Sequence, residues 1–248
     1  MVFSADEIDR YARHLVLREI GGPGQQKLKA ARVLIVGAGG LGAPAALYLA
    51  AAGIGTIGLA DADHVSLSNL QRQVLFTTED VDAPKVDAAQ AHLQALNPLV
   101  AVKAHPHWVT SDNARSLVAG YDIVLDGTDD FATRFAVNAA CLAEHRPLIS
   151  GALGRWTGQI GVFCREDGPC YRCLVPEIPP EAETCQRVGV IGALAGVIGS
   201  MMALEAIKLA AGIETGLTGR LLIHDALAAE VRTVRLPKDP HCPACGHH

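Results

Sequence analysis

The sequence predicts an α/β protein with a mostly parallel central sheet that is extended by antiparallel strands near the C-terminus. Three observations predict this class. A glycine-rich turn joins an apolar strand pattern to a helix pattern, strand and helix patterns alternate over the first two-thirds of the chain, and two Cys-x-x-Cys pairs occupy the last third. The chain has 248 residues, which is enough for one large α/β domain.

The composition excludes several classes of protein. Half of the residues are hydrophobic and 19% are charged, so the chain can bury a sizeable core. The formal net charge is −5 and no basic tract occurs, which argues against a nucleic-acid partner. No secretory signal begins the chain, and the longest weakly polar run, residues 43–58, carries Gly and Pro between strand patterns. We therefore expect a cytoplasmic protein without a membrane span.

The first 30 residues predict two helices. Ser4 followed by Glu7 is typical of a capping box, and the helix that it starts is expected to run to about Arg18. Residues 21–24, which are rich in glycine, are expected to break this helix. Residues 25–31 are then expected to form a short second helix.

The glycine-rich turn follows at once. Residues 32–36 are a β-branched apolar run, and the helix after the turn extends to about Ala52. Strand, glycine turn and helix in this order predict a Rossmann-like nucleotide-binding fold, in which helix N-terminal amides face a phosphate. A second strand over residues 56–60 ends on Asp61, where an acid meets ribose hydroxyls. The glycines predicted to surround the phosphates are Gly37, Gly39, Gly40 and Gly42.

Cations beyond Asp61 change the expected ligand. The run Ser68-Asn69-Leu70-Gln71-Arg72-Gln73 comes first, and Lys85 opens a helix that is expected to end near Leu96. The glycine turn alone favours NAD and a dehydrogenase. Two cations converging on the phosphates favour a triphosphate instead, because negative charge grows on its oxygens during transfer.

The alternation continues as far as residue 164. Strands are predicted over residues 100–104, 121–126, 147–150 and 159–164, and helices over residues 111–118 and 133–143. The helix at 111 has Ser111 or Asp112 as its expected cap. Thr128, Asp129 and Asp130 follow the 121–126 strand at its carboxyl end, where ligands bind in an open α/β sheet. We interpret Asp130 as a helix cap and Asp129 as the ligand or metal residue.

The pattern changes after residue 164. Residues 168–189 predict an exposed crossover loop, residues 190–211 a long apolar helix, and residues 220–224 and 231–235 a pair of strands. We expect a single domain over residues 1–248. It comprises N-terminal helices (1–30), a nucleotide-binding core (31–165) and a C-terminal part (166–248).

The cysteines predict a metal site. Two Cys-x-x-Cys pairs supply four thiolates, which is the closed set of a structural zinc site; they are Cys170, Cys173, Cys242 and Cys245. A disulfide pair is the alternative, although a chain without a secretory signal disfavours it. Cys185 stands apart, beside Arg187. It is a candidate for a covalent role, with a structural cysteine as the alternative.

Together these motifs resemble the ThiF/MoeB/HesA family, whose members are relatives of the ubiquitin-activating enzymes and act on bacterial ubiquitin-like sulfur carriers. The resemblance covers nearly the whole chain. Its most specific part is the Ser68–Gln73 run combined with the paired Cys-x-x-Cys motifs. Its other segments, in order, are Arg10–Arg13, Gly37–Gly42, Asp61–Asp63, Pro84-Lys85, Thr128–Asp130 and Thr184-Cys185.

The resemblance implies a reaction. ATP and magnesium adenylate the C-terminal Gly-Gly carboxylate of a small carrier protein of the MoaD or ThiS type. The acyl adenylate then accepts sulfur to give a thiocarboxylate, in molybdopterin or thiamin biosynthesis. The chain ends at the second cysteine pair, so we expect a separate sulfur donor, a cysteine desulfurase or a rhodanese. Features of both pathways occur, and the carrier stays open.

The resemblance also assigns residues. Asn69, Arg72 and Lys85 are expected to contact the phosphates, and Asp129 to hold magnesium. Arg13 is expected to reach the ATP of the other subunit, which requires a homodimer. Gln73 and Thr128 complete the expected cofactor-binding set.

Three other functions are consistent with parts of the sequence. An NAD-dependent oxidoreductase needs a substrate domain and a proton-handling residue, and neither is evident. A non-catalytic zinc and nucleotide docking module would bind ATP without turnover. A tRNA-modifying dehydratase of the same superfamily is disfavoured by the acidic net charge and the paired cysteines.

Overall fold

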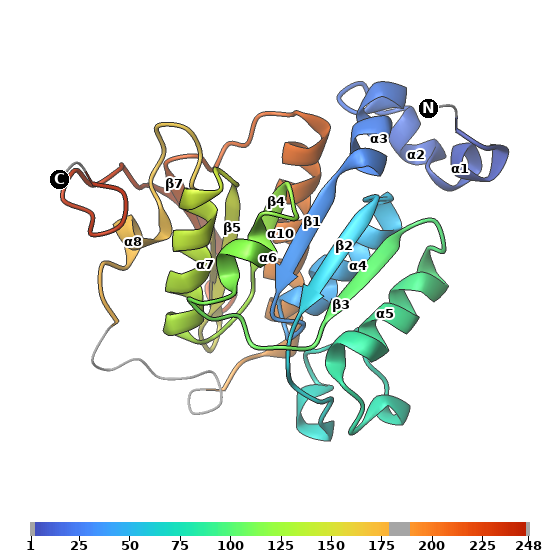
Figure 1. Ribbon diagram of the computed structural model, residues 1–248, viewed down its shortest axis with the longest axis horizontal. Helices are drawn as coiled ribbons and strands as arrows, with labels where there is room; N and C mark the ends of the chain where they lie inside the picture. The colour runs from blue at the N-terminus through green and yellow to red at the C-terminus, as the bar shows by residue number, and fades with distance from the viewer. Residues whose placement is uncertain (1–2, 179–188, 247–248) are drawn as a thin grey trace.

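The computed structural model describes residues 3–178 and 189–246. One eight-stranded sheet runs through the molecule in the order β3-β2-β1-β4-β5-β6-β7-β8 (Figure 1). Its strands are β1 (Arg32–Val36), β2 (Thr56–Ala60), β3 (Ala101–His105), β4 (Ile123–Asp126), β5 (Leu148–Leu153), β6 (Thr157–Phe163), β7 (Arg220–Asp225) and β8 (Glu230–Arg235).

Strand direction divides the sheet into two parts. Strands β1 to β5 pair in parallel, whereas β6, β7 and β8 are antiparallel to their neighbours. The predicted class, a mostly parallel sheet with C-terminal antiparallel strands, is therefore confirmed. In the register of β1, Val36 lies opposite Ala60 on one side and Asp126 on the other. The carboxyl ends of β1, β2 and β4 thus meet at one edge, where the strand order reverses.

Helices cover both faces of the parallel part (Figure 1). One face packs on α4 (Gly42–Ala52), α5 (Lys85–Leu96) and α10 (Gly192–Ala211), and the other on α6 (Ala114–Val118) and α7 (Phe131–Ala143). Strand β1 shows why. Val33 and Ile35 belong to the first core, whereas Leu34 and Val36 belong to the second, so both faces of the strand are buried.

The N-terminal helices differ from the prediction. The capping box of Ser4 and Glu7 is present, but α1 (Ala5–Arg10) stops well before Arg18 and is followed by the short α2 (Ala12–Leu15). The break falls at Tyr11, which is buried and whose hydroxyl accepts a hydrogen bond from Asn97. Burial of this side chain outweighs the local preference for one continuous helix.

The glycines in residues 21–24 do not interrupt a helix as expected. They form the first turn of α3 (Gly21–Ala30). A β-carbon on Gly24 would lie 3.0 Å from the Ile20 side chain and 3.9 Å from Ala211 of α10. Close packing of α3 on its surroundings therefore selects glycine here and overrides its poor helix propensity.

Most other boundaries lie within three residues of the predicted ones. The cap position of α6 is Asn113, so the expectation of Ser111 or Asp112 was wrong. The segment from residue 168 is not wholly exposed either. It contains α8 (Tyr171–Leu174), and both Cys170 and Tyr171 are buried.

Among the described residues, α10 is the one helix long and apolar enough to cross a membrane by length and composition, with a mean hydropathy of 1.6. It packs instead against α4, β5 and β6. A β-carbon on Gly199 would lie 2.5 Å from the Leu41 carbonyl, so this helix touches the chain just before α4 very closely. One side of the helix therefore belongs to the first hydrophobic core, whereas Val197 and Leu204 on the same helix are exposed. The cytoplasmic location stays a prediction.

Candidate nucleotide site and cysteine cluster

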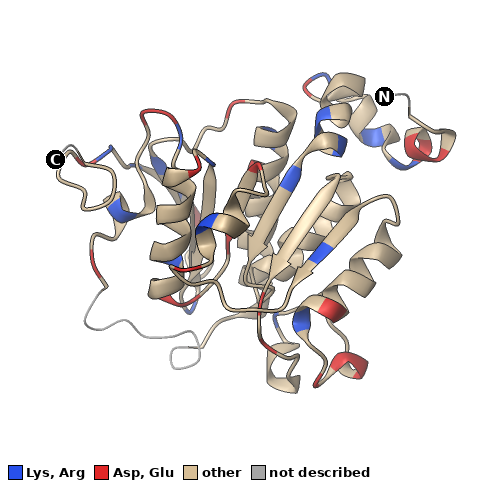
Figure 2. Cartoon of the chain, in the orientation of Figure 1, with Lys and Arg blue, Asp and Glu red and all other residues tan. Residues whose placement is uncertain are grey.

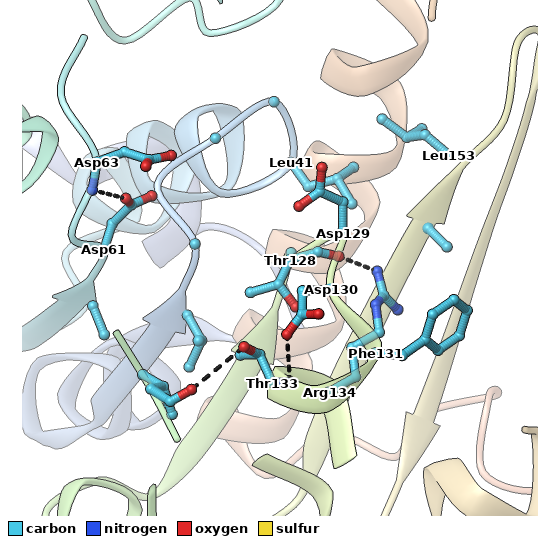
Figure 3. A pocket seen from close by; sticks show the side chains of 18 of the residues that line it. Leu41, Asp61, Asp63, Thr128, Asp129, Asp130, Phe131, Thr133, Arg134 and Leu153 are labelled. Atoms are coloured by element: carbon cyan, nitrogen blue, oxygen red, sulfur yellow. Dashed lines mark hydrogen bonds between the residues drawn. The ribbon is translucent and has the colours of Figure 1, made fainter. Parts of the chain in front are cut away.

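A cavity of about 350 Å³ opens at the carboxyl ends of β1, β2 and β4 (Figure 3). It lies at the edge where parallel sheets bind ligands. The predicted site residues that line it are Gly37, Gly39, Gly40, Asp61, Asn69, Arg72, Gln73, Lys85, Thr128 and Asp129. Segments far apart in the sequence thus converge on one cavity.

The glycine turn has the geometry that its predicted role requires. Gly37 has φ +88°, a conformation that favours glycine. A β-carbon on Gly42 would lie 1.9 Å from the Gly37 carbonyl, so only glycine allows α4 to start this close to β1. Gly39 has space before it, since the nearest atom to a β-carbon there would be Nε2 of Gln73 at 3.6 Å. Phosphate binding at this turn stays a prediction.

Asp61 holds the glycine turn in place. Its Oδ2 accepts a hydrogen bond from the Ala38 amide at 2.8 Å, and its Oδ1 accepts one from the Asp63 amide at 2.8 Å. The residue is 8% exposed. Each carboxylate oxygen keeps a second acceptor position, so the structure leaves room for the predicted ribose contact and adds a structural role that the sequence did not reveal.

The two predicted cations sit in different surroundings. The Lys85 ammonium is buried, 2.8 Å from Asp63 Oδ2 and 3.9 Å from Asp61 Oδ2. The Arg72 guanidinium lines the cavity, is half-buried and donates to Oδ1 of Asn69 at 3.0 Å. The charge of Lys85 is therefore balanced by carboxylates within the chain, and a bound phosphate would compete with them for it.

Gln73 lies beside these cations and is 4% exposed. Its Oε1 has no hydrogen-bond partner among the described residues. A buried amide oxygen without a partner is costly, and a ligand in the cavity is one way to satisfy it. This observation fits the cofactor-binding role predicted for Gln73.

The two acids in the loop after β4, Asp129 and Asp130, make different contacts. Asp130 is the N-cap of α7 and accepts a hydrogen bond from the Thr133 amide at 2.8 Å, so the helix-cap interpretation is confirmed. Burial alone would raise the pKa of Asp130, but the hydrogen bonds from Thr133 outweigh it and hold the pKa below its ordinary value. Asp129 makes no hydrogen bond within the described chain and lines the cavity, so its carboxylate is available to a ligand or metal.

Sequence reasoning missed Arg134. It lies on α7 and lines the cavity, yet it is 5% exposed. Its guanidinium donates to the carbonyls of Thr128 and Gly151 and to Oγ of Ser150. The available signal was the one charged residue of α7, which lies one turn into the helix and four residues after Asp130.

Arg13 does not reach this cavity. It is exposed on α2, and α3 leads from there directly into the amino end of β1, which is the edge opposite the site (Figure 1). A contribution of Arg13 to the cavity of its own chain is therefore excluded by distance along the sheet. The predicted contribution to a partner subunit stays a prediction.

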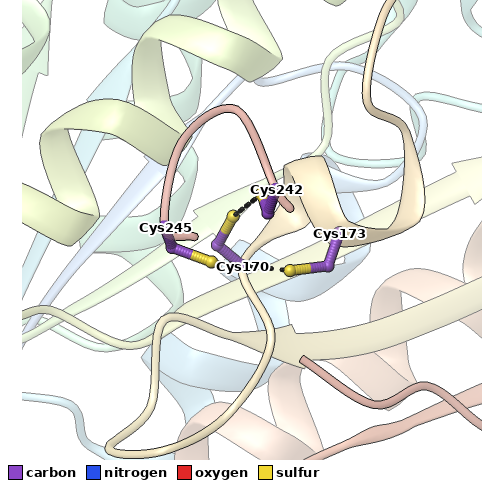
Figure 4. A group of neighbouring side chains, drawn as sticks. All are labelled: Cys170, Cys173, Cys242 and Cys245. Atoms are coloured by element: carbon purple, nitrogen blue, oxygen red, sulfur yellow. Dashed lines mark hydrogen bonds between the residues drawn. The ribbon is translucent and has the colours of Figure 1, made fainter. Parts of the chain in front are cut away.

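The four cysteines of the two Cys-x-x-Cys pairs come together (Figure 4). Their Sγ atoms all lie within 4.8 Å of one another, with Cys170 and Cys242 at 3.5 Å and Cys173 and Cys245 at 3.5 Å. These are free thiols, so the disulfide alternative is not seen. Tetrahedral zinc with bonds of about 2.3 Å places sulfurs about 3.8 Å apart, which this cluster matches.

The surroundings of the cluster also suit a metal. Burial raises the pKa of Cys173 to about 11 and that of Cys170 further, so a bound cation would favour ionisation of these two thiols. Backbone amides of Asp239 and Ala244 point at sulfurs at 3.5 Å. The residues thus fit zinc, which would join the C-terminal tail to α8. Cys185, the candidate for a covalent role, lies outside the described residues.

Charge elsewhere is dispersed. Over the part of the chain that the structure describes, Lys and Arg as well as Asp and Glu occur in both halves of the fold (Figure 2). That nucleic acid is not a partner stays a prediction.

The fold and the site together define an α/β protein with a cavity at the carboxyl ends of its parallel strands and a cluster of four cysteines. Comparison with known proteins narrows this class. The ThiF family model matches residues 11–244, and the chain belongs to this family.

Curated relatives agree along almost the whole chain. A sulfur carrier protein adenylyltransferase of Thermus thermophilus is 48% identical, covering 99% of this chain and 93% of the relative. The SAMP-activating enzyme E1 of Haloferax volcanii is 44% identical, covering 98% and 90%. The adenylyltransferase and sulfurtransferase MOCS3 of Anopheles gambiae is 49% identical over 97% of this chain, which spans only 55% of that relative.

Solved structures show the same fold at lower identity. A crystal structure of E. coli MccB superposes with a TM-score of 0.85 at 24% identity, covering 99% of this chain and 76% of that chain. At this identity the likeness establishes the fold and leaves the substrate to other arguments.

Proposed function

We propose that this protein is an adenylyltransferase that uses ATP to activate the C-terminal carboxylate of a ubiquitin-like sulfur carrier protein. The observation that carries the proposal is the convergence of Arg72, Lys85 and Asp129 on one cavity beside the glycine turn. The ThiF family membership and a relative named as a sulfur carrier protein adenylyltransferase, 48% identical over 99% of this chain, support the same activity.

The proposed reaction requires positively charged groups at the phosphates and does not require a general base. A carboxylate attacking the α-phosphate brings one anion against another, and the barrier is largely electrostatic repulsion. Arg72 and Lys85 would offset that repulsion on the phosphate oxygens. The nucleophile is already ionised, so no general base is needed, and this reaction is compatible with a cavity in which His107 is the only histidine among the described lining residues.

Two metals complete the proposal. Asp129 would hold magnesium, which when bound neutralises charge on the phosphate oxygens. Cys170, Cys173, Cys242 and Cys245 would hold zinc as a structural ion. The cluster joins the C-terminal tail to α8, and none of its four cysteines lines the cavity. Tyr171 of α8 does line it.

The finer parts of the function belong to the same proposal. The adenylated carrier would accept sulfur from a separate donor, and Arg13 would complete the site of a partner subunit in a homodimer. The pathway, molybdopterin or thiamin, is left to experiment. We also propose that the chain forms one domain, because a single sheet runs from the N-terminal strands to the C-terminal ones.

The test is carrier-dependent exchange of labelled pyrophosphate into ATP, with a panel of carriers that end in Gly-Gly. Exchange with one carrier, and none with the same carrier lacking its Gly-Gly, is the expected result, and it names the pathway as well. Binding of ATP without exchange for any carrier would favour a docking module. Binding of NAD in place of ATP would favour an oxidoreductase.

A further inference from the structure

Arg134 occupies an unusual position beside the proposed nucleotide site. It is a cation that is 5% exposed, and it forms no salt bridge within 4.0 Å among the described residues. Burial alone would lower the pKa of Arg134, but the negative charge of the buried Asp126 carboxylate, with smaller contributions from Tyr171 and Asp129, holds the pKa above its ordinary value. Oxygen acceptors arranged around the guanidinium take its hydrogen bonds. They are the carbonyls of Thr128 and Gly151, the hydroxyl of Ser150 at 3.1 Å and the hydroxyl of Tyr171 at 3.4 Å.

The Thr128 contact is the most informative one. Arg134 donates from Nη2 to the Thr128 carbonyl (Figure 3). The buried Asp126 carboxylate accepts the two donors of the same residue, the Thr128 amide at 3.0 Å and its hydroxyl at 2.7 Å. All three polar groups of Thr128 are thus fixed from two sides. The carbonyl that Arg134 holds belongs to the peptide bond leading into Asp129.

Arg134 and Asp126, which bind Thr128 from its two sides, are themselves connected through Ser150. Ser150 accepts from Arg134 and lies 3.4 Å from the second oxygen of Asp126. Tyr171 adds its ring, whose centroid is 5.6 Å from the Arg134 guanidinium carbon. Arg134 is therefore held by β5 and α8 while it holds the loop after β4, so the loop takes its orientation from the rigid sheet.

The donor count indicates how Arg134 acts. Four of the five N–H groups of an arginine lie on its two Nη atoms, and both Nη atoms of Arg134 are engaged by protein oxygens. Little donor capacity remains for a ligand. Its contribution to the cavity is therefore made through the loop that it orients and not by contact with substrate.

We propose that Arg134 is a positioning residue that aims the Asp129 carboxylate into the cavity by fixing the Thr128–Asp129 peptide. The proposal rests on the proposed function in one respect, namely that Asp129 binds the magnesium of the ATP complex. A single lysine ammonium cannot span the Thr128 and Gly151 carbonyls and the Ser150 hydroxyl as the planar guanidinium does. Charge alone should therefore not replace Arg134.

The first measurement is the magnesium dependence of pyrophosphate exchange at saturating ATP and carrier, in Arg134→Lys and Arg134→Gln. Loss of a residue that orients a metal ligand typically weakens metal affinity about 10–100-fold, so the half-maximal magnesium concentration should rise at least about tenfold. A variant that is merely less stable would lose amplitude at an unchanged half-maximal concentration. An unchanged magnesium dependence in both variants would overturn the proposal.

Arg115→Lys is the matched control. Arg115 lies on α6, and its Nε donates to Glu144 at 2.7 Å, but its side chain is 72% exposed and lies away from the cavity. This variant should keep the magnesium dependence of the parent protein. Tyr171→Phe removes only the long 3.4 Å contact and keeps the ring, so it should shift the dependence by no more than about twofold.

The second measurement separates this proposal from the proposed function. Hydrogen exchange of the amides in the segment 128–131 should be faster in Arg134→Lys than in the parent protein and in Arg115→Lys, with or without a carrier. Equal exchange rates would overturn the positioning role. Absence of pyrophosphate exchange in the parent protein would count against the proposed function alone, since the loop measurement does not depend on it. If Arg134→Gln fails to fold, Arg134→Lys and Ser150→Ala carry the test.

Discussion

The Asp61 carboxylate accepts a hydrogen bond from the Ala38 amide at 2.8 Å, and this contact ties the end of β2 to the glycine turn after β1. The turn is thus not shaped by its glycines alone. An acid from the neighbouring strand holds it, and the same acid lies 3.9 Å from the buried Lys85 ammonium. Backbone, acid and cation form one unit at the bottom of the cavity.

Asp61→Ala should therefore destabilise the protein as well as weaken ATP binding. The Ala38 amide would be buried without a partner, at a cost of about 1–3 kcal/mol. Urea denaturation gives the free energy of unfolding, and titration calorimetry gives the ATP affinity. Asp112→Asn is the control, because Asp112 is exposed and lies outside the cavity, so it should change neither stability nor ATP affinity. Equal stability of parent and Asp61→Ala would contradict the structural role.

Asp129→Ala should remove adenylation while leaving the fold intact. The carboxylate makes no hydrogen bond within the described chain, so its loss should change the melting temperature little. Removal of one preorganised charge interaction commonly costs ~10²–10³ in rate, and exchange of pyrophosphate into ATP measures it. Asp130→Ala should show the reverse, with most activity kept and about 1 kcal/mol of stability lost with the cap of α7. Full activity of Asp129→Ala would sink its assignment to magnesium.

Arg13→Ala and Arg72→Ala should each be inactive, yet recover activity when mixed. Random reassortment makes half of the dimers mixed, and each mixed dimer has one site with both arginines intact, so about a quarter of the parent activity should return. The two variants should be mixed in denaturant and refolded together, so that their subunits can form mixed dimers. Arg10→Ala, which alters a neighbouring exposed arginine on α1, serves as an active control. If mixing restores nothing, Arg13 does not act across a subunit boundary.

Removal of zinc should lower the melting temperature. Loss of even ~3 kcal/mol lowers the melting temperature of a chain of this size by ~6–12 °C. Elemental analysis should find one zinc per chain, and Cys242→Ser should reduce both zinc content and stability. Cys141→Ser, at a buried thiol outside the cluster, is the control for cysteine substitution as such. A melt that is unchanged on chelation would mean that the four thiols have another role.

The free energy of unfolding should fall as the pH is lowered, because His105 becomes protonated more readily in the unfolded chain. Burial, helped by the charges of His107 and Lys103, lowers the pKa of His105 below its ordinary 6.5, and its Nε2 lies 2.7 Å from the Tyr121 hydroxyl. The unfolded chain then binds the proton more readily than the folded one, so this contribution is complete above about pH 6.5 and is lost as the pH falls below it. His105→Gln should show a smaller fall in unfolding free energy between pH 7 and pH 5. An identical fall in both proteins would show that His105 does not contribute to the pH dependence of stability.

Local patterns were sufficient for the elements around the site. The β-branched run of β1, the glycine turn and the apolar α4 predict one another, because a buried strand and a close helix leave room for little besides glycine. The roles of Asp129 and Asp130 were separable for a similar reason, since a helix cap has a fixed place in the chain. Tyr11 and Gly24 were misjudged, because their conformation depends on distant residues that pack against them.

The sequence by itself determined the fold class, the glycine turn, the family and the four cysteines, because each is expressed in short-range spacing or in residue types that few other structures tolerate. Only the tertiary structure decided which groups hold these motifs in place. The contact of Asp61 with Ala38 and the grip of Arg134 on Thr128 join segments that strand pairing and helix packing bring together. Such contacts depend on where a side chain points in the folded chain, and no local pattern records that direction.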